Sequence, residues 1–157
     1  MKGRRIIIDI IDFFINKNYK ITLWAKNNIR DTNNKKWTPK SEYQRNFLEH
    51  YCYDTYISDN ERQKGKTEAL IIRSIYEACN NNDLNILFAC KSFNNIKNII
   101  TRTKNFINNS NSIKDFVYQT NPFSLSFNNG SKIIYKSCLE KNFSRGYKKD
   151  LLLLDEY

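Results

Sequence analysis

The sequence is poor in the residues from which metal clusters and disulfide frameworks are built. Its 157 residues contain one histidine, His50, and four cysteines that lie far apart and form no Cys-x-x-Cys pair. Structural zinc sites and disulfide-rich domains are recognised by closely spaced cysteines and histidines. The sequence therefore predicts neither kind of site, and a reducing cell interior is the better compartment. The cysteines are Cys52, Cys79, Cys90 and Cys138.

A long uninterrupted hydrophobic run is also missing. Residues 6–15 are mostly apolar after a basic start, but Asp9 and Asp12 interrupt them and no small-residue cleavage site follows. A secretory signal needs such a site, and a bilayer-spanning helix needs about 20 apolar residues. We therefore expect neither a signal peptide nor a spanning helix. Residues 6–24 instead predict an amphipathic helix that packs on the domain without a membrane partner; the alternative is docking on a membrane surface or another protein.

Glycine and proline are scarce, at four and two residues, whereas Asn, Lys, Ile, Tyr and Phe are abundant. This composition fits translation of an AT-rich genome. Part of the positive charge can therefore reflect the genome and not a binding partner. The formal charge of +10 still favours a nucleic acid partner, because Lys and Arg displace the counterions of phosphates. The alternative is a solvated basic surface. A solvated surface is the preferred interpretation for the basic residues of the helix expected over residues 93–107 and of the segment just before it. These residues are Lys91, Lys97, Arg102 and Lys104.

Helical and strand-like hydrophobic patterns alternate along most of the chain, which is long enough for one domain. Such alternation is typical of an α/β domain in which helices cover both faces of a mainly parallel sheet. A hairpin is expected at Asn129-Gly130, because this pair favours a tight turn. The expected helices cover residues 41–51, 67–79 and 93–107; the expected strands cover residues 51–58, 84–90, 116–118, 124–135 as the hairpin, and 151–154.

Residues 61–67 have the pattern of a phosphate-binding loop that opens a helix. Gly65 lets backbone N–H groups approach an anion, Lys66 reaches the terminal phosphates and the Thr67 hydroxyl can hold Mg²⁺. The first glycine of the general pattern falls on Asn60, and asparagine is the other residue that best tolerates a positive φ. The segment therefore predicts a site for ATP and Mg²⁺.

Four consecutive leucines at residues 151–154 precede Asp155 and Glu156. The run predicts a strand that is buried on both faces and ends at an active-site edge. There Asp155 can serve the magnesium and Glu156 can polarise the attacking water. The alternative is an ordinary buried strand, because many such strands end in polar residues.

Gln44 lies on the expected helix upstream of the phosphate loop, beside Tyr43. A glutamine amide can both donate to and accept from an adenine edge, and an aromatic ring can stack on the base. The pair is therefore a plausible adenine clamp. The alternative is a surface glutamine next to a core tyrosine.

Together these motifs resemble the ATPase domain of phage terminase large subunits, the motors that pump DNA into viral procapsids. The run from Arg62 to Thr67 matches the terminase variant R-Q-x-G-K-[ST] better than the general phosphate loop. An Asn-Gly-Ser turn at residues 129–131, Ser-Arg-Gly at 144–146 and the strand that ends in Asp-Glu follow in a similar order. The resemblance covers residues 37–157. Residues 1–36, an N-terminal helix and a polar linker, lie outside it.

The resemblance implies a P-loop NTPase fold of the ASCE type, which binds ATP and Mg²⁺ and couples hydrolysis to movement of double-stranded DNA. It also implies a homo-oligomeric ring, a portal and a small terminase subunit as partners, and the host cell cytoplasm as location. The arginine of the loop is proposed to sense the γ-phosphate, since a guanidinium stabilises developing negative charge. The implied roles are nucleotide binding for Gln44, Gln63, Lys64, Gly65, Lys66 and Thr67, metal binding for Thr67 and Asp155, and catalysis for Arg62 and Glu156.

In this class of ATPase a later strand lies between the phosphate-loop strand and the Asp-Glu strand. The sequence ends at Tyr157, so we expect a P-loop fold that is incomplete at its C-terminus and a poor ATPase when alone. A superfamily 2 helicase or translocase fragment is one alternative, since it shares a Gln before the loop, Gly-Lys-Thr and Asp-Glu. A non-catalytic basic protein that binds nucleic acid is the other.

Overall fold

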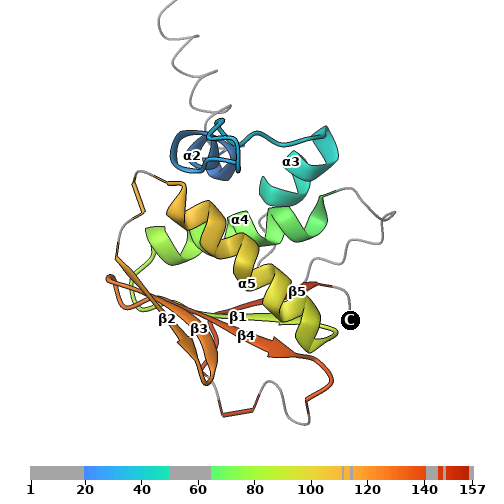
Figure 1. Cartoon of the computed structure of the whole chain (residues 1–157), viewed down its shortest axis with the longest axis vertical. Helices are drawn as coiled ribbons and strands as arrows, with labels where there is room; N and C mark the ends of the chain where they lie inside the picture. The colour runs from blue at the N-terminus through green and yellow to red at the C-terminus, as the bar shows by residue number, and fades with distance from the viewer. Residues whose placement is uncertain are drawn as a thin grey trace, which may run out of the picture.

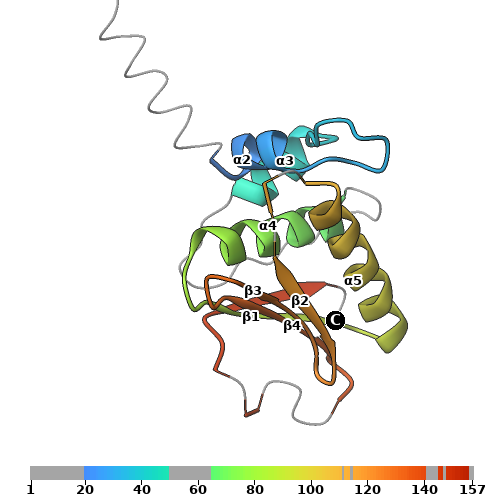
Figure 2. The ribbon, with the colours of Figure 1, turned by 60° about the vertical axis from the view of Figure 1, so that its left-hand side comes forward.

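The computed structural model describes residues 20–49, 65–110, 112–113, 115–140, 145–146 and 148–155. In these ranges the chain forms three layers (Figure 1). A sheet forms the first layer, α4 (Lys66–Asn80) and α5 (Phe93–Asn108) cover it, and α2 (Lys20–Asn28) and α3 (Glu42–Glu49) lie on α4. Figure 2 shows the same order of layers from another side.

The sheet has five described strands in the order β2-β3-β4-β1-β5. Strands β4, β1 and β5 run parallel, whereas β2 pairs antiparallel with β3 and β3 with β4. The strands are β1 (Asn85–Cys90), β2 (Phe116–Thr120), β3 (Phe123–Phe127), β4 (Lys132–Ser137) and β5 (Leu151–Asp155).

The predicted α/β class is therefore confirmed, but the sheet is mixed and not mainly parallel. Strands β2, β3 and β4 follow one another through short turns, and a strand that returns through a short turn runs antiparallel to its predecessor. The predicted hairpin at Asn129-Gly130 is confirmed, because β3 and β4 flank this turn and pair with each other. Only the strands separated by longer connections pair in parallel.

All four described helices lie on one side of the sheet in both views (Figures 1 and 2). The prediction of helices on both faces is therefore wrong for the described part of the chain. The prediction that the leucine strand is buried on both faces is wrong as well. Leu153 faces the helices and is 6% exposed, whereas Leu152 and Leu154 point the other way and are 42% and 40% exposed. Successive side chains of a strand face opposite sides, so a strand covered by helices on one side alternates in this way.

Helix α4 is the middle layer and is apolar on most of its circumference. Ile71, Ile72 and Ile75 are fully buried because the sheet lies on one side of α4 and the outer helices lie on the other. Ile21 and Ala25 of α2 belong to the same hydrophobic core. Residues 20–28 therefore pack on the domain. Residues 6–19, which carry the predicted amphipathic pattern, lie outside the described ranges.

The β3–β4 hairpin also closes the C-terminal end of α4. The side-chain amide of Asn129 donates to the carbonyl oxygens of Ala78 and Asn81, at 2.8 Å each. The Ser131 hydroxyl donates to the Asn81 carbonyl and accepts the N–H of Leu84 at the entrance to β1. These contacts satisfy carbonyl groups that a helix end leaves without intrahelical partners. They tie the C-terminal end of α4 to the hairpin, while the residues predicted to bind phosphate lie at the other end of the helix.

Candidate nucleotide-binding site

Thr67 and Asp155 are hydrogen-bonded although they are 88 positions apart in the sequence. The Thr67 hydroxyl lies 3.0 Å from one carboxylate oxygen of Asp155 and 2.8 Å from the other. Thr67 is the second residue of α4, and Asp155 is the last residue of β5, at the carboxyl end of the parallel strands. The fold thus joins one residue from each of the two motifs that the sequence predicts to form a site.

The pair offers the kind of ligand that magnesium takes. Mg²⁺ prefers hard oxygen ligands at about 2.0–2.1 Å in an octahedron, which places neighbouring ligand oxygens about 3 Å apart. The hydroxyl and the carboxylate oxygens have this chemistry and this separation. The chemistry of the donors fits Mg²⁺, and the separations are also those of an ordinary hydrogen bond. Within the described ranges, no group of three or more His, Cys, Asp and Glu side chains gathers in a metal-binding arrangement.

Gly65 begins α4 in a conformation that suits an anion site. It is the N-cap residue, with φ +78° in the left-handed region, and it offers no side chain to the first N–H groups of the helix. Such groups and the helix dipole attract anions. Lys66, the first residue of α4, is half-buried beside this cap. Gly65, Lys66 and Thr67 are therefore placed together at the N-terminus of one helix.

Gln44 holds Gly65 from the upstream helix. Its side chain is fully buried, its Nε2 donates to the Gly65 carbonyl (3.0 Å), and its Oε1 accepts the backbone N–H of Lys40 (2.7 Å). The Ser41 hydroxyl in turn accepts the backbone N–H of Gln44 at the start of α3, a typical helix N-cap contact. The alternative of a surface glutamine is wrong. Contact with adenine stays a prediction; in this structure both ends of the amide are engaged with the protein.

Glu68, the residue after Thr67, anchors the α2–α3 connection and α5 to the first turn of α4. It is 8% exposed and accepts hydrogen bonds from Trp37 Nε1 (2.8 Å), Lys40 Nζ (3.0 Å) and Arg102 (3.2 Å). Burial works to raise the pKa of Glu68, but the bonds from Trp37 and Lys40 and the charges of Lys40 and Arg102 outweigh it and lower that pKa. Glu68 is therefore held as a carboxylate beside the candidate phosphate site.

Sequence reasoning did not find this cluster. A glutamate in the first turn of a helix is common, because it complements the helix dipole, and so it carries no special signal. Lys40 precedes α3 and Arg102 lies on α5, and no local pattern connects either of them to Glu68. The packing of α5 and of the α2–α3 connection beside the start of α4 brings them together.

A hollow of about 420 Å³ adjoins Glu68. It lies between the loop that follows α2, the first turn of α4 and the last turns of α5. Its lining combines aromatic rings, amides and charged side chains. The residues are Arg30, Asp31, Thr32, Lys36, Trp37, Thr38, Lys40, Glu68, Arg102, Asn105, Phe106 and Asn109.

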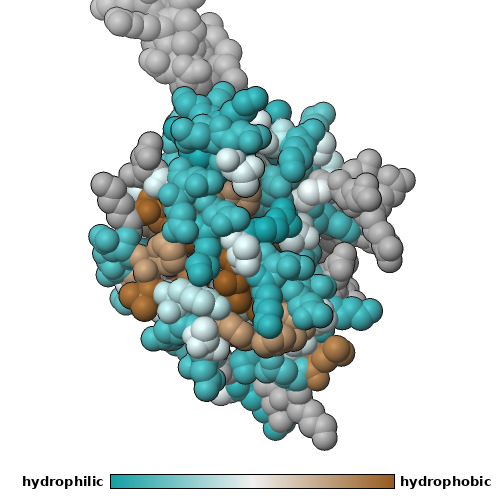
Figure 3. Space-filling view, viewed as in Figure 1, coloured by the Kyte–Doolittle hydropathy of each residue, from teal (hydrophilic) through white to brown (hydrophobic). Residues whose placement is uncertain are grey.

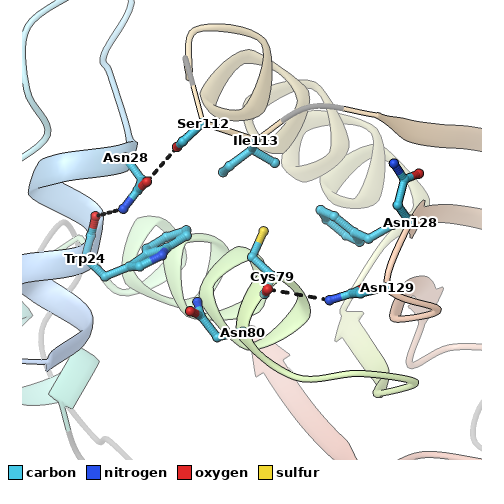
Figure 4. A pocket seen from close by; sticks show the side chains of 9 residues that line it. Trp24, Asn28, Cys79, Asn80, Ser112, Ile113, Asn128 and Asn129 are labelled. Carbon is cyan, nitrogen blue, oxygen red and sulfur yellow. Dashed lines mark hydrogen bonds between the residues drawn. The ribbon is translucent and has the colours of Figure 1, made fainter.

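A second hollow of about 300 Å³ lies at the opposite end of α4 (Figure 4). Its polar side chains are tied into the fold: Asn28 donates to the Trp24 carbonyl and accepts from Ser112, while Asn129 caps α4. Burial raises the pKa of the Cys79 thiol in this wall to about 12, so the thiol is protonated at neutral pH. None of the predicted site residues lines this hollow, which serves as a junction between α2, α4 and the β3–β4 hairpin.

The remaining predicted residues lie outside the described ranges. These are Arg62, Gln63 and Lys64 of the loop and the proposed catalytic Glu156. The expected strand at residues 51–58 also lies outside them. The described part of the site thus consists of Gln44, Gly65, Lys66, Thr67 and Asp155.

None of the described helices is both long and apolar enough to cross a bilayer. In comparisons with known proteins, no family model matches the chain and no curated protein is found to be similar to it. The function is therefore argued from the residues and their geometry.

Proposed function

We propose that this chain is the ATP-binding portion of a viral DNA-packaging motor of the terminase type, with a P-loop NTPase fold. The contact between Thr67 and Asp155 carries the proposal. A Gly-Lys-Thr tripeptide and an apolar strand that ends in Asp are each common by themselves. Their meeting through the fold, at the carboxyl edge of parallel strands, is the relationship that a nucleotide and magnesium site requires.

Each described residue has a physical task in this proposal. Gly65 opens the start of α4 to phosphate, because it has a left-handed backbone and no side chain. The Lys66 ammonium donates to the terminal phosphates. Thr67 and Asp155 hold Mg²⁺, which when bound supplies charge neutralisation to the phosphates. Gln44 keeps the loop entrance in position through the Gly65 carbonyl.

The roles of Arg62 and Glu156, the partners and the location rest on the sequence resemblance alone. Arg62 is proposed to contact the γ-phosphate and Glu156 to orient the attacking water, which together would give ATP hydrolysis. Double-stranded DNA, a portal, a small terminase subunit and a ring of identical subunits are proposed as the partners of the motor. Host cell cytoplasm is the proposed location.

Titration of the purified chain with a fluorescent ATP analogue, with and without Mg²⁺, tests the proposal. We expect saturable binding that Mg²⁺ strengthens and that Lys66→Ala abolishes. The same substitution at the exposed Lys26 of α2 is the matched control and should leave binding unchanged. Steady-state ATP hydrolysis measured on the same samples separates a binding module from an enzyme.

Two results would overturn the proposal. The first is a folded chain, judged by circular dichroism and a cooperative thermal transition, that does not bind the analogue at millimolar concentration. The second is equal binding by the parent chain and Lys66→Ala, which would place the nucleotide elsewhere. Binding without turnover would leave the nucleotide site intact and remove only the hydrolytic role of this chain.

A further inference from the structure

We propose that the exposed face of α5, together with the basic rim of the adjoining hollow, binds the backbone of double-stranded DNA. The exposed surface along the helix is called the α5 face below; its ammonium groups belong to Lys91, Lys97 and Lys104. The inference rests on the proposed function, since it names the surface by which the motor holds its DNA. The α5 face shares no residue with the candidate nucleotide site, is proposed to take a different ligand and is tested by a different experiment.

The charge pattern around α5 is one-sided. Residues 84–114 contain no aspartate or glutamate, although 16 of the 157 residues of the chain are acidic. The same stretch contains five basic residues, and Asp83 and Asp115 are its nearest acidic neighbours in the sequence. Basic residues without compensating acids create a positive field, and such a field attracts phosphate backbones.

The arrangement of these charges suits a long anion rather than a single phosphate. Lys97 and Lys104 are seven residues apart on one helix, which corresponds to about 10 Å at 1.5 Å per residue. Lys91 is exposed immediately before the helix begins. Double-stranded DNA carries a charge for each 1.7 Å or so of its axis, so a row of spaced ammonium groups can meet several of its phosphates.

Neutral donors fill the space between the charges. The helix presents a stripe of exposed asparagine and threonine side chains, and the described contacts assign them no hydrogen bonds within the protein. Asn and Thr side chains are common donors to DNA phosphates. In Figure 3, which shows the molecule from the side where α5 faces the viewer, the surface over this helix is mostly hydrophilic. The stripe consists of Asn94, Asn98, Thr101, Asn105 and Asn108.

Two aromatic rings support the ammonium groups. The Nζ atom of Lys97 lies 4.8 Å from the centre of the Phe93 ring, and that of Lys104 lies 4.4 Å from the centre of the Tyr118 ring. Cation–π contacts of this kind are favourable at the protein surface. They restrict the two side chains in the free protein, so less freedom is lost when a phosphate binds.

The rim of the hollow extends the α5 face beyond the end of the helix. Arg30, Lys36 and Lys40 line the hollow together with Arg102 and Asn105 of α5. Glu68 at the base is engaged by Lys40 and Arg102, whose side chains remain 71% and 43% exposed. Asp31, the other acidic residue of the lining, accepts the backbone N–H groups of Asn33 and Lys35 at 2.8 Å each. Both carboxylates are thus engaged within the protein, while Lys40 and Arg102 remain accessible to solvent.

The chemistry of this face favours a duplex over a single strand. Proteins that bind single strands without sequence preference use exposed aromatic rings on which bases stack. Phe93 is the exposed aromatic residue at the start of α5, but its ring packs against Phe123, with 5.4 Å between centroids, and carries Lys97. The rings that line the adjoining hollow, Trp37 and Phe106, are buried and half-buried. Along α5 the described residues therefore offer charges and donors to a backbone, and the exposed ring of Phe93 is already engaged within the protein.

Fluorescence anisotropy of a labelled DNA duplex, titrated with the full chain at several salt concentrations, tests the inference. Each lost lysine–phosphate contact should reduce the slope of log affinity against log salt by about 0.9 and weaken binding roughly tenfold near 0.1 M salt. We therefore expect the double variant Lys97→Gln/Lys104→Gln to lose a slope of about two. Lys148→Gln, in the exposed connection that precedes β5, removes the same charge outside the α5 face and should change neither value. A labelled single strand serves as the competing probe.

The inference is overturned if the double variant binds the duplex with the parent's affinity and slope, if Lys148→Gln weakens binding equally, or if the chain prefers the single strand. The ATP-analogue titration on the same variants separates this outcome from failure of the nucleotide site. Loss of nucleotide binding in Lys66→Ala with unchanged duplex binding supports both proposals. Duplex binding that depends on the α5 face in a chain that binds no nucleotide would overturn the proposed function alone.

Discussion

The side-chain amide of Gln44 donates a hydrogen bond to the Gly65 carbonyl over 3.0 Å, in a position where the glutamine is fully buried. A β-carbon added to Gly65 would lie 2.5 Å from Gln44 Nε2, which is closer than real contacts allow. The two residues therefore fit only because position 65 has no side chain. This contact ties the entrance of the candidate phosphate site to the helix that precedes it.

Gly65→Ala should be strongly destabilising for two separate reasons. A left-handed backbone costs an alanine about 1–2 kcal/mol, and the forced approach to Gln44 adds an overpacking cost of about 1–3 kcal/mol. Urea unfolding measures the sum. Gly146→Ala is the control, because Gly146 has the same φ of +78° and nothing within 4 Å of an added β-carbon. Equal losses in the two variants would show that the contact with Gln44 carries no cost.

Gln44 has two possible roles, which are holding the loop through the Gly65 carbonyl and contacting the adenine base. One substitution can distinguish them. Gln44→Glu keeps the shape and the acceptor for the Lys40 N–H but replaces the donor that faces the Gly65 carbonyl, so stability should fall by about 1–3 kcal/mol. If the residue acts by holding the loop, the affinities for ATP and GTP analogues should fall by the same factor. A loss confined to the ATP analogue would instead assign Gln44 to the adenine base.

Long periodic segments of this fold were predictable from the sequence. The helix expected over residues 93–107 is α5, and the strand expected over 84–90 is β1, each within a residue or two. Their hydrophobic patterns are local, and so is the Asn129-Gly130 turn signal. Leu152 shows where local reasoning fails, because its exposure depends on whether helices cover both faces of the sheet. Which faces of the sheet the helices cover is set by the connections between the strands and not by the sequence of β5.

The candidate site was predictable to the same extent. Residues with a motif, such as Thr67 and Asp155, were identified, and the fold brings them together. Glu68 was missed because its partners come from other elements and have no motif of their own. The proposed role of α5 could not be separated from an ordinary solvated face, because the exposed positions and the contacts of Lys97 and Lys104 with aromatic rings become visible only once the helix is placed.

The buried carboxylate of Glu68 should make stability depend on pH. Its pKa in the folded chain lies below the ordinary value of 4.5, so its contribution is fully present above that value and is lost as the pH falls through the lowered folded pKa. Glu68→Gln should therefore be destabilised relative to the parent at pH 7, and the difference should shrink in the acidic range. Urea unfolding from pH 7 to pH 3 measures it. Glu42→Gln, at an exposed position of α3, is the control and should show no such trend.

Asp155→Asn tests whether the contact with Thr67 marks a magnesium site. The amide oxygen can still accept the Thr67 hydroxyl, so the fold is retained, but the negative charge that attracts a cation is gone. Mg²⁺ should then no longer strengthen binding of the ATP analogue, a loss of roughly tenfold or about 1.4 kcal/mol. Binding without Mg²⁺ should stay the same. Thr67→Ser keeps the hydroxyl and should behave as the parent, whereas Thr67→Val should resemble Asp155→Asn. A Mg²⁺ effect that survives in both Asp155→Asn and Thr67→Val would show that the hydrogen bond is structural and that the metal binds elsewhere.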